Sequence, residues 1–539
     1  MSMNRGATLA LLLALVLGIV AGVLGAPAFA VLAPLFVGVC ALWPAAGVVA
    51  LIVACALDRF AVSVGGPNVR PDELAALALA AALVLRAVLR PRAASTPRRR
   101  RPALESAWQG RTLKGLSGRQ ASADPSESVP APFLAPFLQG QAAATPSYAG
   151  LGREVWGVRA SLPLPLPLLL PLLAYLGANM LATLTAADGA RGLSLDLITL
   201  DLAILYAALV VSLDTPARLL FGVRLWLGVA AVEAVVGLLA FALYLGVHAT
   251  VPGVQLDPNS NNAPLVYGTL YEGNIFGSYM SAAFLIALAL VAEEGVRRKG
   301  LLYLVLAATA VGLLVSGTRS AWGATAVGAV VLFALLRLGR GGGGGGRRSR
   351  LLLRLAGGLL AVGLVVGVGL TVLPASVTGA LGARAQGLLN FGSGSGYGRV
   401  LLYREALAEW QGHPLLGLGP GSFAYKLSGD VSTSAAWLPN LTLLTLHDTG
   451  ILGLLALVWL FGAFYAQGVG ALRRAPPGET RAALAGLIAA VTALLVAFQL
   501  TPGLNLGYPW AVLALGVAAV RATAQVREER AAREEPAAA

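Results

Sequence analysis

The chain has 539 residues, of which 57% are hydrophobic and only 12% are charged, whereas an average soluble domain is about 25% charged. A soluble protein could not bury that much apolar surface, so a mean hydropathy of +0.77 indicates a membrane protein. The net charge of +14 does not indicate a nucleic-acid partner, because the arginines stand in short runs beside apolar blocks, as they do at cytoplasmic ends of membrane spans.

Apolar blocks recur along the whole chain, and most are roughly 18 to 25 residues long, the length that crosses a hydrocarbon core. They predict an all-α, polytopic helical membrane protein with about 12–14 transmembrane helices. The first block follows Arg5 and imitates a signal peptide, but hydrophobicity continues to Leu57, so a retained span is favoured over a cleaved one. The candidate spans are residues 7–25, 27–44, 46–57, 72–90, 161–183, 191–213, 219–246, 273–294, 299–317, 319–337, 351–373, 441–467, 481–500 and 505–521.

Short runs of basic residues separate these spans. If the N-terminus is cytoplasmic, strict alternation of the spans places every basic run on the cytoplasmic side, as the positive-inside rule requires. We therefore expect an even number of spans and both termini in the cytoplasm. The runs are residues 98–101, 297–299, 347–354, 473–474 and 527–533.

The same topology divides the chain into six parts. Residues 91–159 are rich in Arg, Pro, Ser, Ala and Gly without periodicity, which is typical of a disordered basic cytoplasmic insertion. Residues 374–440 form the one extracytoplasmic loop long enough to hold a folded site, so function is expected there. The other parts are N-terminal transmembrane helices at 1–90, central ones at 160–373, C-terminal ones at 441–522 and a cytoplasmic tail at 523–539.

An amphipathic helix is predicted within the large loop, at residues 399–410 (RVLLYREALAEW). Its apolar side chains recur at helical spacing, so we expect it to lie on the outer membrane surface. The glycine-rich residues 415–423 (LLGLGPGSF) follow it. Such a segment can bring backbone N–H groups close to an anion, although a plain tight turn is the commoner meaning. The apolar side chains of the helix are Val400, Tyr403, Leu407 and Trp410.

Two short polar stretches interrupt apolar blocks on the expected outer side. In residues 316–320 (SGTRS), Arg319 keeps its charge, so it must snorkel to the interface, pair with a carboxylate or hold an anionic ligand. In residues 271–274 (YEGN), Glu272 offers a partner or a proton acceptor beside Asn274. For each stretch a packing role is as good an interpretation as a functional one.

A third polar stretch, residues 439–453 (PNLTLLTLHDTGILG), leads from the large loop back into the membrane. Asn440, His447 and Asp448 offer polar groups at the mouth of that span. His447 belongs to the residue type that exchanges a proton near neutral pH, but a lone interfacial histidine is more often simply hydrogen-bonded.

The sequence lacks several familiar motifs. It contains no Walker-type loop, His-rich cluster or cysteine pair, since Cys40 and Cys55 stand separately inside apolar blocks. No paired acidic motif opens the first outer loop, where Asp58 stands beside Arg59. ATP hydrolysis and metal-dependent glycosyl transfer therefore lack their usual parts, and we expect neither a metal nor another cofactor.

Taken in order, these motifs resemble the O-antigen ligase and polymerase family, bacterial membrane glycosyltransferases that use polyprenyl-diphosphate-linked glycans. The similarity rests on the Ser-Gly-Thr-Arg-Ser turn, an arginine with an amphipathic helix, and His-Pro-Leu-Leu-Gly-Leu-Gly at residues 413–419. It continues at the next span, where Asn440, Gly450 and Gly453 match the family pattern of His-Asn, nine residues, Gly-x-x-Gly. The resemblance spans residues 260–470, and its specificity comes from the order of individually weak motifs.

The chain departs from the family pattern at one position. The histidine that precedes Asn440 in the family, where it activates the acceptor hydroxyl, is Pro439 here, and proline cannot exchange a proton. His447 lies about 80° away around a helix, so it is no automatic replacement. Either another base acts, or the reaction depends little on a base, or transferase activity has been lost.

The resemblance implies a metal-independent, inverting transfer at the outer face of the bacterial inner membrane. Its partners would be a polyprenyl-diphosphate-linked glycan donor, a glycan or lipid-linked acceptor, and membrane lipid. Arginines would neutralise the diphosphate in place of a metal. A lipid-linked glycan transporter or flippase, and a glycan-binding relative without catalysis, stay open as alternatives. The implied substrate-binding residues are Arg319, Arg399, Arg404, Glu272 and Asn274, and the implied catalytic residues are His447, Asp448 and Asn440.

Overall fold

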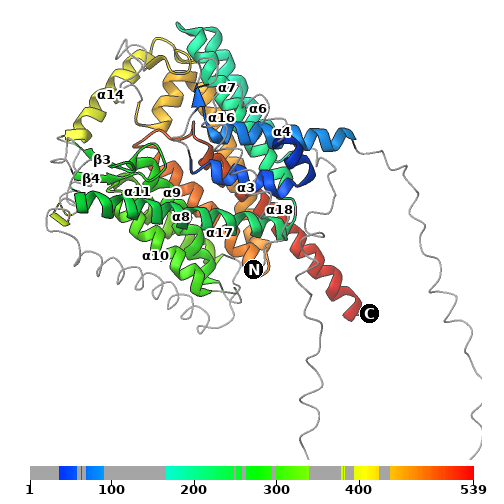
Figure 1. Ribbon diagram of the computed structural model, residues 1–539. Helices are drawn as coiled ribbons and strands as arrows, with labels where there is room; N and C mark the ends of the chain where they lie inside the picture. The colour runs from blue at the N-terminus through cyan, green and yellow to red at the C-terminus, as the bar shows by residue number, and fades with distance from the viewer. Residues whose placement is uncertain are drawn as a thin grey trace, which may run out of the picture.

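The structure is a computed structural model, and it describes residues 36–57, 62–63, 68–89, 166–247, 251–257, 263–293, 296, 299–338, 378–379, 382, 394–423 and 438–538. Helices dominate this part of the chain, and the strands form two short antiparallel hairpins (Figure 1). The helices are α3 Pro44–Ala54, α4 Pro71–Leu89, α6 Leu169–Leu184, α7 Gly189–Ser212, α8 Pro216–Val247, α9 Gly273–Ala292, α10 Lys299–Val315, α11 Arg319–Arg337, α14 Gly394–Trp410, α16 Leu441–Arg474, α17 Glu479–Ala497 and α18 Gly507–Ala538. The strands are β1 Val62–Ser63, β2 Asn68–Val69, β3 Val254–Asp257 and β4 Ala263–Val266.

Within the described residues, seven helices are long and apolar enough to cross a membrane. They are α7, α8, α9, α11, α16, α17 and α18, and the shorter apolar helices α3, α6 and α10 accompany them. The predicted all-α, multi-pass membrane protein is thereby confirmed. The total of 12–14 spans stays a prediction, because the expected spans at 7–25 and 351–373 lie outside the described residues, as does the expected insertion at 91–159.

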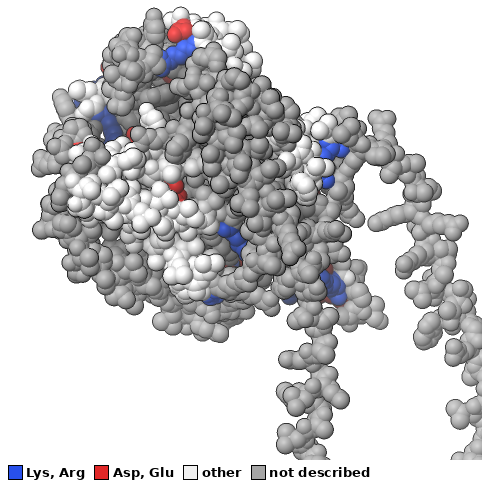
Figure 2. Space-filling view, in the orientation of Figure 1, with Lys and Arg blue, Asp and Glu red and all other residues white. Residues whose placement is uncertain are grey.

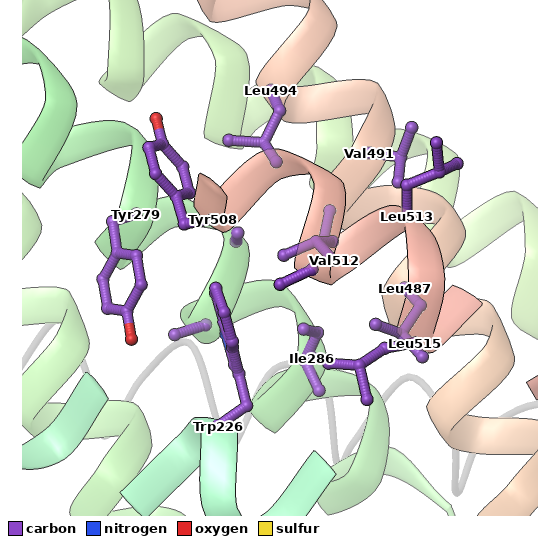
Figure 3. Packing of buried hydrophobic residues seen from close by; sticks show 14 of the residues in the cluster. Trp226, Tyr279, Ile286, Leu487, Val491, Leu494, Tyr508, Val512, Leu513 and Leu515 are labelled. Carbon is purple, nitrogen blue, oxygen red and sulfur yellow. The ribbon is translucent and has the colours of Figure 1, made fainter. Parts of the chain in front are cut away.

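Helices α9 and α17 form the centre of the bundle. Every residue in the most apolar window of α9 is buried, as expected for a helix that is hydrophobic all round. Small residues let the two helices approach closely, since a Cβ on Gly486 would lie 2.9 Å from the Cα of Ile286. Beside them, Tyr279 packs between Trp226 and Tyr508, with ring centroids 4.9 Å and 5.6 Å apart (Figure 3).

The outer helices present apolar side chains outward. Leu239 of α8, Val330 of α11 and Val458 of α16 are all exposed, as suits helices surrounded by lipid. Charged side chains are sparse on the described surface seen in Figure 2. The described outer helices therefore present a largely apolar surface.

One end, which we call the basic end, is held by ion pairs. Arg218 Nη1 lies 2.6 Å from Asp214 Oδ1, and the buried Arg481 pairs with the buried Glu293 across 3.8 Å. The terminal Arg473 and Arg474 of α16 belong to the same end, because the following loop donates from the Gly478 N–H to Glu293 Oε1. The basic runs that the structure describes therefore share one end, as alternation of the spans predicted.

The opposite end, which we call the site end, is where α9, α11 and α16 begin and where α17 finishes. The β3–β4 hairpin pairs Val254 with Val266 here, and α14 lies on the same side of the molecule (Figure 1). Glu233, an acidic residue inside α8, fastens the turn after this hairpin. Its two carboxylate oxygens accept from the backbone N–H and the hydroxyl of Thr269, both at 2.7 Å. Glu233 therefore has a structural role.

Candidate functional site

The predicted Ser-Gly-Thr-Arg-Ser stretch is a tight turn between α10 and α11. Gly317 adopts a φ of +64°, and the Thr318 hydroxyl donates to the Gly273 carbonyl over 2.8 Å. The Thr318 N–H donates to Ser316 Oγ over 3.2 Å. These bonds join the starts of α9 and α11, so Arg319, the first residue of α11, is held by a rigid turn at the site end.

Arg399 approaches Arg319 from α14. Burial lowers the pKa of Arg399, and the positive charge of Arg319 lowers it further, while Tyr403 and Glu272 oppose the shift. Two guanidinium groups that repel each other within one partly buried region favour binding of an anion, because its negative charge offsets their repulsion. Figure 1 shows α14 and the start of α11 on the same side of the molecule. We call Glu272, Arg319, Arg399 and Tyr403 the arginine cluster.

Glu272 occupies the N-cap position of α9, but its side chain makes no capping bond to that helix. Instead Oε1 accepts from Asn274 Nδ2 at 3.3 Å and from the Thr501 hydroxyl at 3.4 Å. Burial raises the pKa of the Glu272 carboxyl, and the two hydrogen bonds and Arg399 counteract part of that shift. The cluster therefore contains one carboxylate beside its two arginines.

The start of α16 closes the cluster from another side. Asn440 caps α16, because its Oδ1 accepts from the Leu443 N–H at 2.8 Å, while its Nδ2 donates to the Gln499 carbonyl at 3.1 Å. The Tyr403 hydroxyl donates to the Pro439 carbonyl at 2.9 Å. Asn440 and Pro439 thus tie α14, α16 and the end of α17 together, and Pro439 stands next to the arginine cluster.

His447 and Asp448 belong to a different group. Nδ1 of His447 lies 2.8 Å from Asp448 Oδ1, and Nε2 lies 3.0 Å from Glu409 Oε2. The other oxygen of Asp448 accepts from the Gly421 N–H at 2.9 Å. We call Glu409, His447 and Asp448 the histidine cluster, and each ring nitrogen of its histidine faces a carboxylate.

Glu409 is the member of this cluster that sequence reasoning missed. It lies on α14, within the predicted amphipathic helix at residues 399–410. His447 faces it from α16, which begins far along the chain, so no local spacing in the sequence predicts this pair. The one available signal was that two partly apolar helices each carried a titratable residue near the same loop.

The glycine-rich segment wraps around a kink in α16. Gly450 adopts a φ of +65° and a ψ of −165° inside this helix, which leaves neighbouring backbone groups without helical partners. The segment supplies them: the Leu418 N–H donates to the His447 carbonyl and the Gly419 N–H donates to the Asp448 carbonyl, both at 2.9 Å. Its N–H groups therefore serve the protein's own backbone, which favours the tight-turn interpretation over an anion site.

The packed face of α14 differs in part from the predicted one. Ala406 is buried, and Leu402 and Tyr403 pack beside it against Phe423 and Leu438. Leu407, which we expected on the apolar side, is exposed, and so is Leu401. Exposed leucines suit a helix that rests on a membrane surface.

The structure thus separates the predicted site residues into two groups. Arg319, Arg399, Glu272 and Asn274 meet at the site end, whereas His447 and Asp448 do not join them. Arg399 and Glu409 lie about 15 Å apart along the axis of α14. Arg404 is exposed, and it points about 140° away from Arg399 around the helix.

No group of three or more His, Cys, Asp or Glu side chains suited to a metal ion occurs among the residues that the structure describes.

Comparison with known proteins adds one finding. Residues 303–458 match the family model described as O-antigen ligase. The matched segment runs from α10 into α16, so it includes both arginines and the histidine cluster, but Glu272 and the α17–α18 loop lie outside it. No curated protein matches the chain.

Proposed function

Because residues 303–458 match the family model described as O-antigen ligase, we propose that this membrane protein transfers a polyprenyl-diphosphate-linked glycan to an acceptor hydroxyl. It acts as a ligase or a polymerase at the outer face of the bacterial inner membrane. The observation that carries the proposal is that the matched segment includes both Arg319 and Arg399, which interact electrostatically at one polar end of the bundle.

The chemistry needs positive charge more than it needs a metal. A lipid diphosphate gains negative charge as the glycosidic bond breaks, and fixed guanidinium groups stabilise that charge when they are already in place. Two unit charges about 4 Å apart attract by about 4 kcal/mol near a protein surface, and each arginine donates two hydrogen bonds to one phosphate. Losing either arginine is expected to cost about a hundredfold in rate, the usual effect of removing one such donor.

The proposed arrangement follows from the site end. The polyprenyl tail lies among the apolar helices, the diphosphate meets Arg319 and Arg399, and the sugars lie beside α14. The acceptor hydroxyl attacks the anomeric carbon from the face opposite the diphosphate, which inverts that carbon. Arg473 and Arg474 at the basic end favour a cytoplasmic position for that end, with both termini on the same side.

The test replaces Arg319 or Arg399 by alanine in the native host. The length and attachment of surface glycans are compared with those of a deletion strain, at matched expression. Arg473→Ala is the matched control, because Arg473 is exposed at the basic end. We expect both site variants to resemble the deletion strain and the control to resemble wild type; unchanged glycans in both site variants would contradict the assignment.

The same experiment separates the competing functions. A transferase defect leaves lipid-linked glycan accessible from outside the cell, whereas a flippase defect leaves it on the cytoplasmic side. Transporters usually bind substrate near the membrane midplane, but the arginine cluster lies where spans begin and end, which favours an enzyme. A glycan-binding relative without catalysis would bind the lipid diphosphate and leave the surface glycans unchanged when it is deleted.

A further inference from the structure

The proposed transfer requires a proton acceptor. A bond forms between the acceptor oxygen and the anomeric carbon, the bond from that carbon to the diphosphate oxygen breaks, and the diphosphate leaves with the electron pair. The hydroxyl proton must then go to a base. Pro439, which stands where the family has a histidine, cannot accept it.

Distance limits where the base can be. The reacting atoms lie about 3–3.5 Å apart, and the base lies about 3 Å from the hydroxyl that it deprotonates. With a further contact of about 2.8 Å between phosphate and guanidinium, the base falls within roughly 10 Å of the arginines. His447 belongs to the histidine cluster, and both of its ring nitrogens already face carboxylates, those of Asp448 and Glu409.

Tyr403 is close enough but is protonated at neutral pH. Burial raises the pKa of its hydroxyl above the usual value, which is about 10. The hydroxyl also donates to the carbonyls of Pro439 and Gln499. Tyr403 therefore acts as a donor that ties helices together.

Glu272 meets the requirements that His447 and Tyr403 fail. Its carboxylate interacts with Arg399, and it is not consumed by capping α9. Both of its hydrogen bonds go to Oε1. Within the described part of the chain, Oε2 accepts no hydrogen bond, so this oxygen can face an incoming hydroxyl.

We propose that Glu272 is the proton acceptor of the transfer. Asn274 and Thr501 hold one carboxylate oxygen, and the other takes the proton of the acceptor hydroxyl while Arg319 and Arg399 receive the departing diphosphate. This inference rests on the proposed function, and it assigns to the reaction a residue outside the segment that matches the family.

The electrostatics of the arginine cluster suit this role. Burial raises the pKa of the Glu272 carboxyl, which makes the carboxylate a stronger base. The charged group that interacts with it is Arg399 from α14, and Arg399 in turn interacts with Tyr403 and with Arg319 of α11. Arg399 counteracts part of that shift, and the transfer rate is expected to fall when the pH drops through the raised pKa of Glu272.

The test uses the full chain in two measurements. Glu272→Gln retains the shape and hydrogen-bonding capacity of the side chain but cannot accept a proton, and Glu272→Asp retains a carboxylate on a shorter stem. Transfer is measured as surface glycan in the native host and as a pH profile in isolated membranes. Binding of undecaprenyl diphosphate is measured on the purified protein in lipid nanodiscs, with Glu405→Gln, an exposed carboxylate on α14, as the matched control.

The expected result is that Glu272→Gln binds undecaprenyl diphosphate at least as well as wild type but transfers at least a hundredfold more slowly. Glu272→Asp should retain part of the rate, with the acid limb of its pH profile displaced. A Glu272→Gln variant that transfers within threefold of wild type overturns the inference and leaves the proposed function standing. If Arg319→Ala and Arg399→Ala bind undecaprenyl diphosphate like wild type, the proposed function itself fails.

Discussion

The arginine cluster and the histidine cluster both include residues of α14, yet their charges are arranged differently. In the histidine cluster every ring nitrogen has a carboxylate, and Asp448 also accepts from the backbone of the glycine-rich segment. In the arginine cluster the positive charge of Arg319 lowers the pKa of the partly buried Arg399, while Tyr403 and Glu272 oppose that shift. The histidine cluster therefore holds the fold, whereas the arginine cluster brings two like charges together, which favours binding of an anion.

Removing both arginines of the arginine cluster is expected to have the largest effect on transfer. The double variant Arg319→Ala with Arg399→Ala should lose at least a thousandfold in transfer rate, because neither guanidinium then stabilises the departing diphosphate. Surface glycan in the native host measures this loss. Arg473→Ala serves as the control, and the account is wrong if the double variant keeps more than a tenth of the wild-type glycan.

The next largest effect is expected from a substitution at the kink in α16, and it is an effect on stability. Alanine at Gly450 would adopt an unfavourable positive φ and bring its Cβ into collision with the Leu415 carbonyl, which is expected to cost about 3 kcal/mol. Thermal unfolding in detergent measures it. Gly462→Ala is also in α16 but has open space around its Cβ position, so its melting temperature should equal or exceed that of wild type. Equal melting temperatures for the two variants would show that the kink at Gly450 does not contribute to stability.

The histidine cluster is expected to respond through stability as well. Replacing His447 by alanine leaves Glu409 and Asp448 without their shared partner and should cost about 2 kcal/mol. The melting temperature should fall, while the protein that stays folded still binds undecaprenyl diphosphate. Loss of that binding with an unchanged melting temperature would show that His447 contributes to ligand binding and not to stability.

Arg404 should show the smallest effect. Although it shares α14 with Arg399, it is exposed and points away from the arginine cluster. Arg404→Ala is therefore expected to change surface glycan less than threefold, the scale of an exposed charge. A loss as large as that of Arg399→Ala would show that the cluster extends around α14.

The sequence predicted the helices better than it predicted their contacts. Apolar blocks marked α9 and α11 closely, because the length of a span is fixed by the membrane. The start of α16 at Leu441 was also predicted. The predicted span ended at residue 467, whereas the helix continues to Arg474. The kink at Gly450 was not predicted, because the glycine-rich segment that bonds its backbone groups comes from another part of the chain.

The candidate site was predicted in the same uneven way. Arg319 was recognisable because a permanent charge interrupts two apolar blocks, and Arg399 came from the family resemblance. Their mutual interaction, the pairing of Glu409 with His447 and the bond between Glu272 and Thr501 all join residues distant in the chain. Such contacts follow from the packing of helices and leave no periodicity in the sequence.

Binding of undecaprenyl diphosphate to the purified protein in nanodiscs tests the central distinction most directly. The account predicts that Arg319→Ala and Arg399→Ala each weaken binding at least tenfold, while His447→Ala binds like wild type below its unfolding temperature. The reverse pattern, in which the histidine variant loses binding and both arginine variants retain it, would contradict the account.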